Sequence, residues 1–93
     1  MASLNDATTD DNYTDDNTLK CEGARSFSLQ VVNAAIYLQR TSPAGGGVRN
    51  PSNWGEEEYY LPGYFNPPVS PVEAIRVRSA IAGSPARVTI HAT

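Results

Sequence analysis

The feature that most limits what this chain can fold into is the contrast between its two parts. A polar, acidic stretch rich in Thr, Asn and Asp runs from residue 1 to about residue 19, and a strand-patterned segment follows from about residue 26 to residue 93. Apolar residues are too sparse in the first part for it to fold alone. We therefore expect an extended, acidic N-terminal arm over residues 1–25 and one small β domain over residues 26–93.

A domain this small needs an additional source of stability. It has roughly seventy residues for a core and buries only about 60% of the surface of its unfolded chain. Cys21 is the single cysteine, so the chain cannot form an internal disulfide. No Cys/His cluster predicts a zinc site. Association is the source that remains, and we expect a homo-oligomer without a cofactor or a metal.

The charge of the chain is unevenly distributed. Five aspartates and no Lys or Arg lie in residues 1–19, whereas residues 20–93 hold seven basic against five acidic side chains. An acidic arm is either solvated or docked on the basic surface of a neighbouring subunit. Asp15 and Cys21 stand where a calcium-binding loop starting at Asp10 would need Gly and Glu, so no calcium site is expected. The candidate interface residues of the arm are Asp10, Asp11, Tyr13, Asp15 and Asp16.

Alternating apolar residues predict an all-β domain, either a small β-sandwich or a partly open barrel. Apolar side chains occupy odd positions in residues 27–31 and even positions in residues 36–39. One straight strand cannot hold both sets on the same face, so we expect a bulge or kink near Asn33-Ala34. A helix over residues 28–40 is the competing interpretation, disfavoured by the β-branched content.

Residues 41–71 hold most of the glycines and prolines and predict a long loop. Within it, residues 57–61 are expected to form a short strand that ends at a type II turn at Pro62-Gly63.

Residues 72–80 and 86–92 predict two strands joined by residues 81–85. A hairpin would place Val77 opposite Val88 and Ile75 opposite Ile90.

In that register, Arg78 would face Arg87, with Arg76 close by, and like charges opposed in a sheet require a carboxylate partner. Glu56–Glu58 or an aspartate of a neighbour's arm could provide it. A register shifted by two residues would separate the arginines and leave them solvated. All three arginines are candidate interface residues of the β domain.

Five aromatic side chains lie within twelve residues: Trp54, Tyr59, Tyr60, Tyr64 and Phe65. They could complete the core, form a subunit interface, or stack on sugar rings. We include them among the candidate interface residues.

No motif predicts catalysis. His91 is the only histidine and points outward by alternation, without the partners of a triad. We expect no catalytic role for the thiol of Cys21. The carboxylates of Glu56–Glu58 lack the separation that acid–base catalysis needs. The chain is acidic overall, which argues against nucleic acid as a partner. No apolar run is long enough to span a membrane, and the first residues lack the pattern of a secretion signal.

Three motifs carry a resemblance to a group of known proteins. VNAAIYLQ (32–39), YYLPGYF (59–65) and VEAIRVRSAIAGSPARVTIHA (72–92) resemble the layout of small β-structured virion proteins of tailed bacteriophages, over residues 27–93. The resemblance implies a non-enzymatic structural protein located in the virion, as a capsid decoration or cement protein, a collar subunit or a tail-associated subunit. Its partners would be other virion proteins.

The alternative function is a small carbohydrate- or receptor-binding module that uses the Trp54–Phe65 aromatics, with a host surface glycan as ligand. In a virion subunit these aromatic side chains should be buried against protein. In a binding module, Trp54→Ala should leave assembly intact and weaken glycan binding.

Overall fold

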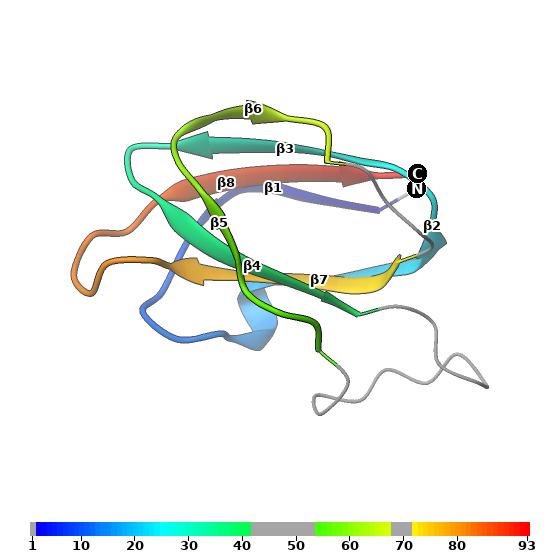
Figure 1. Ribbon diagram of the computed structural model, residues 1–93, viewed down its shortest axis with the longest axis horizontal. Helices are drawn as coiled ribbons and strands as arrows, with labels where there is room; N and C mark the ends of the chain where they lie inside the picture. Colours follow the sequence, from blue (N-terminus) through cyan, green and yellow to red (C-terminus); the bar gives the residue numbers. More distant parts are fainter. Residues whose placement is uncertain (1, 42–53, 68–71) are drawn as a thin grey trace.

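In the part of the chain that the structure describes, the fold consists of eight β-strands and one short 3-10 turn. The computed structural model describes residues 2–41, 54–67 and 72–93 (Figure 1). Within these ranges the strands are β1 (Ala2–Thr8), β2 (Thr18–Ala24), β3 (Phe27–Val32), β4 (Ile36–Thr41), β5 (Glu58–Tyr60), β6 (Gly63–Phe65), β7 (Val72–Ser79) and β8 (Arg87–Ala92), with the 3-10 turn at Asp15–Asn17. The all-β prediction is confirmed.

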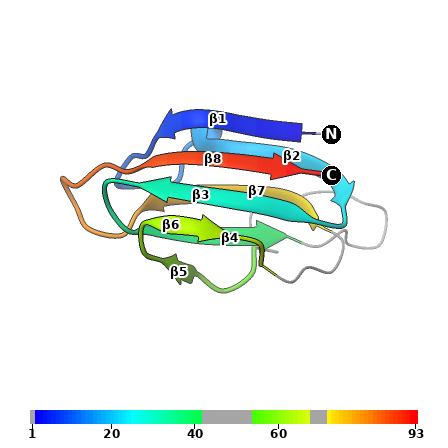
Figure 2. The ribbon, with the colours of Figure 1, turned by 90° about the horizontal axis from the view of Figure 1, so that it is seen from above.

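The strands form two antiparallel four-stranded sheets packed as a sandwich (Figure 2). Sheet I has the order β1-β8-β3-β6 and sheet II the order β2-β7-β4-β5. The two orders match position by position, so each strand lies across the core from a strand next to it in the chain. This is the strand order of a jelly roll, a double-sheet fold of eight strands.

The topology gives the sandwich two different ends. The connections β1–β2, β3–β4, β5–β6 and β7–β8 each cross from one sheet to the other at the same end, which we call the arch end (Figure 1). Both chain termini lie at the opposite end, where Thr93 is hydrogen-bonded to Arg25 and Ser26 through the backbone.

The core lies between the sheets and consists of the inward-facing residues of every second position. Its largest fully buried apolar side chains are Val31, Leu29, Ile36, Leu38, Ile75, Val77, Val88 and Ile90. Leu29 and Val31 explain the odd-numbered pattern of β3, and Ile36 and Leu38 the even-numbered pattern of β4. Because a buried strand position excludes water from an apolar side chain, these residues stabilise the contact between the two sheets.

The N-terminal segment is part of the sandwich, which corrects the expectation of an extended arm over residues 1–25. β1 pairs with β8 from Ala2↔Ala92 to Thr8↔Arg87, and β2 pairs with β7 from Thr18↔Arg76 to Ala24↔Val72. Each is therefore an edge strand of one sheet. Few apolar residues suffice there, because the outer face and the free edge of an edge strand meet water.

A buried polar network ties this segment to the β7–β8 connection. The hydroxyls of Thr9 and Ser79, only 2% and 1% exposed, lie 2.7 Å apart. Thr9 Oγ1 also accepts a hydrogen bond from the amide of Ala86 at 2.8 Å, and the amide of Thr9 donates to the carbonyl of Ala86 at 2.9 Å. The amide and the hydroxyl of Thr9 are thus satisfied inside the protein, as buried polar groups generally are.

The expected bulge near Asn33-Ala34 is instead a crossing between sheets. β3 belongs to sheet I and β4 to sheet II, and Asn33 takes a positive φ of 81° in the connection. Asn tolerates this left-handed conformation better than most residues do. The change from odd to even apolar positions therefore marks a change of sheet. The strand interpretation of residues 28–40 is confirmed, and the helix is wrong.

The predicted hairpin of residues 72–92 is wrong in its pairing, although both strands exist. β7 pairs with β2 and β4, whereas β8 pairs with β1 and β3. Val77 and Val88 therefore lie in different sheets, and Arg78 does not face Arg87. Alternation shows which face of a strand is buried but not which strand lies beside it, so a hairpin and an arch look alike in sequence.

The expected long loop at residues 41–71 contains two short strands in its described part. β5 confirms the strand predicted at residues 57–61, and the chain then crosses from sheet II to sheet I. Gly63 begins β6 with a φ of 157°, whereas the predicted type II turn needs about +80°. A Cβ at Gly63 would lie 3.2 Å from the ring of Phe65, so the glycine makes room for that ring. Residues 42–53 and 68–71 lie outside the described residues.

Candidate interaction surfaces

The outer face of sheet II carries a row of alternating aromatic rings and arginines. The Arg76 guanidinium lies 4.3 Å from the centre of the Trp54 ring and 4.2 Å from that of Tyr13. Arg78 lies 5.5 Å from the Tyr13 ring and 4.7 Å from the Tyr37 ring. We call this row the arginine–aromatic stack. It continues to Tyr59, whose ring centre is 5.5 Å from that of Tyr37.

Hydrogen bonds hold the arginine–aromatic stack in place. Glu57 Oε2 accepts from the Tyr13 hydroxyl at 2.7 Å and from Arg78 Nε at 2.9 Å. Gln39 Oε1 accepts from Arg76 Nε at 2.9 Å and from Nη2 at 2.6 Å. Burial and the hydrogen bond to Glu57 raise the pKa of Tyr13, and the same hydrogen bond lowers the pKa of Glu57. Tyr13 is therefore a neutral donor at physiological pH, and Glu57 is ionised.

The rings of this stack are already occupied by protein. Guanidinium groups lie over Trp54, Tyr13 and Tyr37, with a cation–π attraction of about 0.5–1 kcal/mol per contact at an exposed site. A sugar ring could stack on the face of Trp54 that Arg76 covers only by displacing the guanidinium. The arrangement joins the N-terminal segment, through Tyr13, to sheet II, and therefore acts first as a stabilising element.

A second charged pair stabilises the edge of sheet II. Arg40 binds Glu58 with two hydrogen bonds, Nε to Oε2 at 2.7 Å and Nη2 to Oε1 at 2.6 Å. The Tyr60 hydroxyl donates to Glu58 at 2.9 Å. Burial works against ionisation of Glu58, but the hydrogen bonds from Arg40 and Tyr60 outweigh it and lower the pKa of this carboxyl. Burial, together with the hydrogen bond to Glu58, raises the pKa of Tyr60 to about 12.

The expected carboxylate partners of the arginines are present within the chain. Arg78 pairs with Glu57 at 2.9 Å, and Arg87 pairs with Asp6 of β1. The sequence left open an aspartate from a neighbouring subunit as the partner of these arginines. For Arg87, the partner is Asp6 of the same chain.

The five clustered aromatics of the sequence occupy three separate places. Trp54 and Tyr59 lie on the outer face of sheet II. The rings of Tyr60 and Phe65 contact each other at 5.1 Å and pack against the core. Tyr64 lies alone on the outer face of sheet I and is 66% exposed. The described aromatics therefore do not form a common platform.

The four candidate aspartates of the N-terminal segment also lie in separate places. The carbonyl of Asp10 accepts a hydrogen bond from the amide of Ser79 at 2.7 Å. Asp11 Oδ1 accepts one from the amide of Gly83 at 3.1 Å. Asp10 and Asp11 therefore lie at the arch end, whereas Asp15 and Asp16 are exposed on the 3-10 turn.

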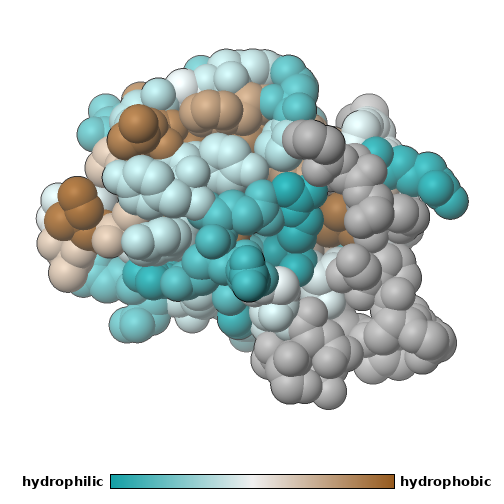
Figure 3. Space-filling view, viewed as in Figure 1, coloured by the Kyte–Doolittle hydropathy of each residue, from teal (hydrophilic) through white to brown (hydrophobic). Residues whose placement is uncertain are grey.

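Three aliphatic side chains at the arch end are more exposed than their apolar character favours. Val32 at the end of β3, Leu61 in the β5–β6 connection and Ile81 in the β7–β8 connection are 42%, 60% and 58% exposed. The hydrophobic areas at the left of Figure 3 lie over this end of the molecule. A backbone hydrogen bond from Ala80 to Ala35 at 3.1 Å joins two of the connections. Sequence analysis missed this apolar surface, because its residues are far apart in the chain.

The described residues offer no evident catalytic or metal centre. Within the described ranges, no group of three or more His, Cys, Asp or Glu side chains is placed to hold a metal ion. Cys21 is buried, and burial together with Glu73 raises the pKa of its thiol to about 11, which makes it a poor nucleophile. His91 is exposed on β8, as alternation predicted.

Comparison with protein-family models, with curated protein sequences and with solved structures finds no match to this chain. A search of the described residues for a helix of sufficient length and apolarity to cross a membrane also finds none.

Proposed function

We propose that this protein is a non-enzymatic structural subunit of a phage virion, of the capsid-decoration, collar or tail-associated type, which binds other virion proteins through its arch end. The observation that carries the proposal is the exposure of Val32 at the end of β3, of Leu61 in the β5–β6 connection and of Ile81 in the β7–β8 connection, all at the arch end. Large apolar side chains exposed at one end of a molecule are a common mark of a protein contact.

The chemistry of the arch end indicates what kind of surface it fits. Asp10 and Asp11 border the apolar residues, with Asp11 bound to the β7–β8 connection that carries Ile81. A partner surface with an apolar centre and basic residues around it would complement both features. The N-terminal segment thus takes part in assembly through the β1–β2 connection.

The fold is compatible with this role. Jelly rolls occur in viral capsid domains, but also in lectins and other proteins, so this support is analogy at the level of the fold. The sequence resemblance to small virion proteins of tailed phages points in the same direction. No described group of side chains favours an enzymatic role more strongly.

The proposal is tested by placing charge in the apolar surface. Leu61→Asp and Ile81→Asp, separately and together, should abolish self-association in sedimentation velocity and attachment to virion proteins of the phage that carries the gene. Both side chains are more than half exposed, so the fold should survive, as circular dichroism would check.

Asn5→Asp is the matched control, because it adds the same charge at an exposed position of β1. It should assemble like the unmodified chain. Assembly that survives both charged substitutions at the arch end would refute this use of the surface.

A further inference from the structure

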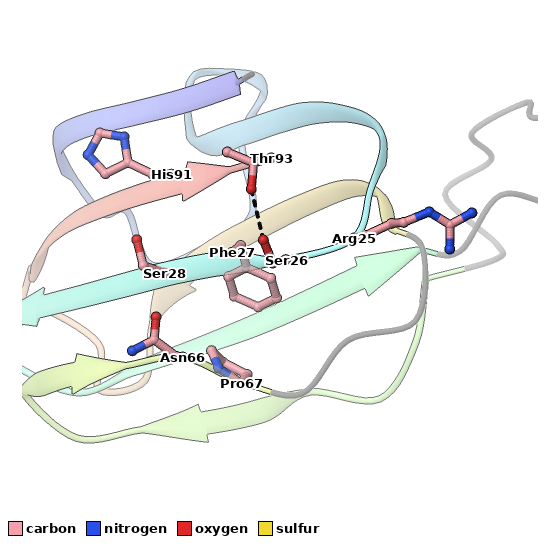
Figure 4. Close-up of a pocket in the computed structure, with 8 residues that line it drawn as sticks. All are labelled: Arg25, Ser26, Phe27, Ser28, Asn66, Pro67, His91 and Thr93. Carbon is pink, nitrogen blue, oxygen red and sulfur yellow. Dashed lines mark hydrogen bonds between the residues drawn. The ribbon is translucent and has the colours of Figure 1, made fainter.

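A regular array of neutral polar side chains covers part of the outer face of sheet I. His91 of β8 is paired with Ser28 of β3, and Gln30 of β3 is paired with Tyr64 of β6. Asn66 follows β6 two residues after Tyr64. Side chains two residues apart on a strand share a face, as do cross-strand partners, so Ser28, Gln30, Tyr64 and His91 point to the same side of three neighbouring strands. In Figure 4, Asn66 lies below Ser28 of β3.

These side chains are available for a ligand. Among the described residues, the side chains of Ser28, Gln30, Asn66 and His91 make no hydrogen bond, and the ring of Tyr64 has no stacking partner. This distinguishes Tyr64 from Tyr13, Tyr37 and Trp54, whose rings lie against arginines. The hydroxyl, amide and imidazole groups can each donate or accept a hydrogen bond.

Ser28, Asn66 and His91 also line an open groove of about 580 Å³ at the end of the sandwich that holds the termini, whereas Gln30 and Tyr64 lie beyond the described lining of the groove. Figure 4 shows Ser28, His91 and Asn66 around it, with Pro67 beside them. A volume of this size is within the range of about 300–1,000 Å³ that small-molecule sites occupy. The Ser26 and Thr93 hydroxyls at its rim bind each other at 2.8 Å.

The polar array contains no Lys, Arg, Asp or Glu side chain. Arg25 also borders the groove, but its guanidinium extends away from the polar array in Figure 4. Arg87, on the same face of β8 nearer the arch end, is paired with Asp6. A charged ligand would find no free cation or carboxylate within the array.

We propose that this face of sheet I, comprising Ser28, Gln30, Tyr64, Asn66 and His91, is a binding site for a neutral carbohydrate. The apolar face of a pyranose ring fits an exposed tyrosine ring through dispersion. Its hydroxyl groups match the neutral donors and acceptors of the array, which fix orientation without the cost of burying a charge. The proposal does not rest on the proposed assembly role, although Val32 of the arch end lies on the same face of β3, two residues after Gln30.

The test is a printed array of neutral and acidic glycans probed with the full chain, followed by NMR titration with the strongest neutral oligosaccharide on that array. The amides of Ser28, Gln30, Tyr64 and His91 should shift more than those on sheet II. Binding to neutral glycans should exceed binding to sulfated ones. No binding to any neutral glycan, or shifts confined to sheet II, would overturn the proposal.

Variants separate stacking from general effects on the surface. Tyr64→Ala should weaken binding about tenfold or more, which corresponds to about 1.4 kcal/mol, whereas Tyr64→Phe should retain most of it. Tyr59→Ala removes an exposed tyrosine from sheet II and should leave binding unchanged. If Tyr64→Ala instead alters only self-association, this face is a protein contact and the carbohydrate proposal is wrong.

Leu61→Asp, which tests the arch end, should not change glycan binding. The two proposals can therefore fail independently.

Discussion

The buried hydroxyl of Thr9 offers a direct measure of how firmly the N-terminal segment belongs to the fold. Thr9→Val keeps the shape of the side chain but removes the acceptor of the Ala86 amide and the partner of the Ser79 hydroxyl. A lost hydrogen bond costs about 0.5–1.5 kcal/mol, and a buried group left without a partner about 1–3 kcal/mol. We expect a loss of about 2–4 kcal/mol, against a total stability of about 5–14 kcal/mol for a chain of this length.

Urea unfolding followed by circular dichroism and by Trp54 fluorescence measures this loss. Thr8→Val is the matched control, because it makes the same change at the neighbouring exposed position, and it should stay within about 0.5 kcal/mol of the unmodified chain. Thr9→Ser keeps the hydroxyl and should cost about 1 kcal/mol for the lost methyl group.

Adding Ser79→Ala to Thr9→Val removes the Ser79 hydroxyl, which Thr9→Val leaves unpaired, so the double substitution should cost less than the sum of the two single substitutions. If Thr9→Val and Thr8→Val have equal stabilities, the network does not bind the segment to the sandwich and the reasoning fails.

Two further predictions concern the edges of the sheets. Deleting residues 1–8 removes the partner of β8, so the shortened chain should lose its dispersed amide NMR spectrum and cooperative unfolding; an arm lying on another subunit would leave both intact. The lowered pKa of Glu58 means that its contribution to stability is complete above about pH 4.5 and is lost as the pH falls through its pKa in the folded state. Glu58→Gln should therefore reduce the loss of stability that the unmodified chain shows at acid pH. Glu57→Gln is the matched change at the neighbouring residue, and it should retain the share of that loss which comes from the Arg40–Glu58 pair.

The sequence alone was sufficient to predict the class of the fold and most strands of residues 26–93. Alternation in residues 27–31, 36–39, 72–80 and 86–92 follows directly from the burial of every second side chain. The two edge strands β1 and β2 escaped prediction, because only a few residues such as Leu4 and Leu19 contact the core from them. A strand with a polar outer face and a free edge has the composition of a disordered segment.

The interaction surfaces depend on pairings that alternation cannot reveal. Tyr13 meets Arg76 because the β1–β2 connection and the pairing of β2 with β7 bring the N-terminal segment over sheet II. Tyr64 and Tyr60 are only four residues apart, yet the crossing between β5 and β6 places them in different sheets. Proximity in sequence made the aromatics look like one patch, and topology separated them.

The pairing of β1 with β8 has a consequence for how the protein is made. Sheet I cannot be completed until β8 has left the ribosome, because β8 is the neighbour of β1 among the described strands. Contacts between such distant parts of a chain are slow to form. The acidic, polar composition of β1 then has a second effect: it keeps this strand hydrated and discourages aggregation until β8 has been synthesised.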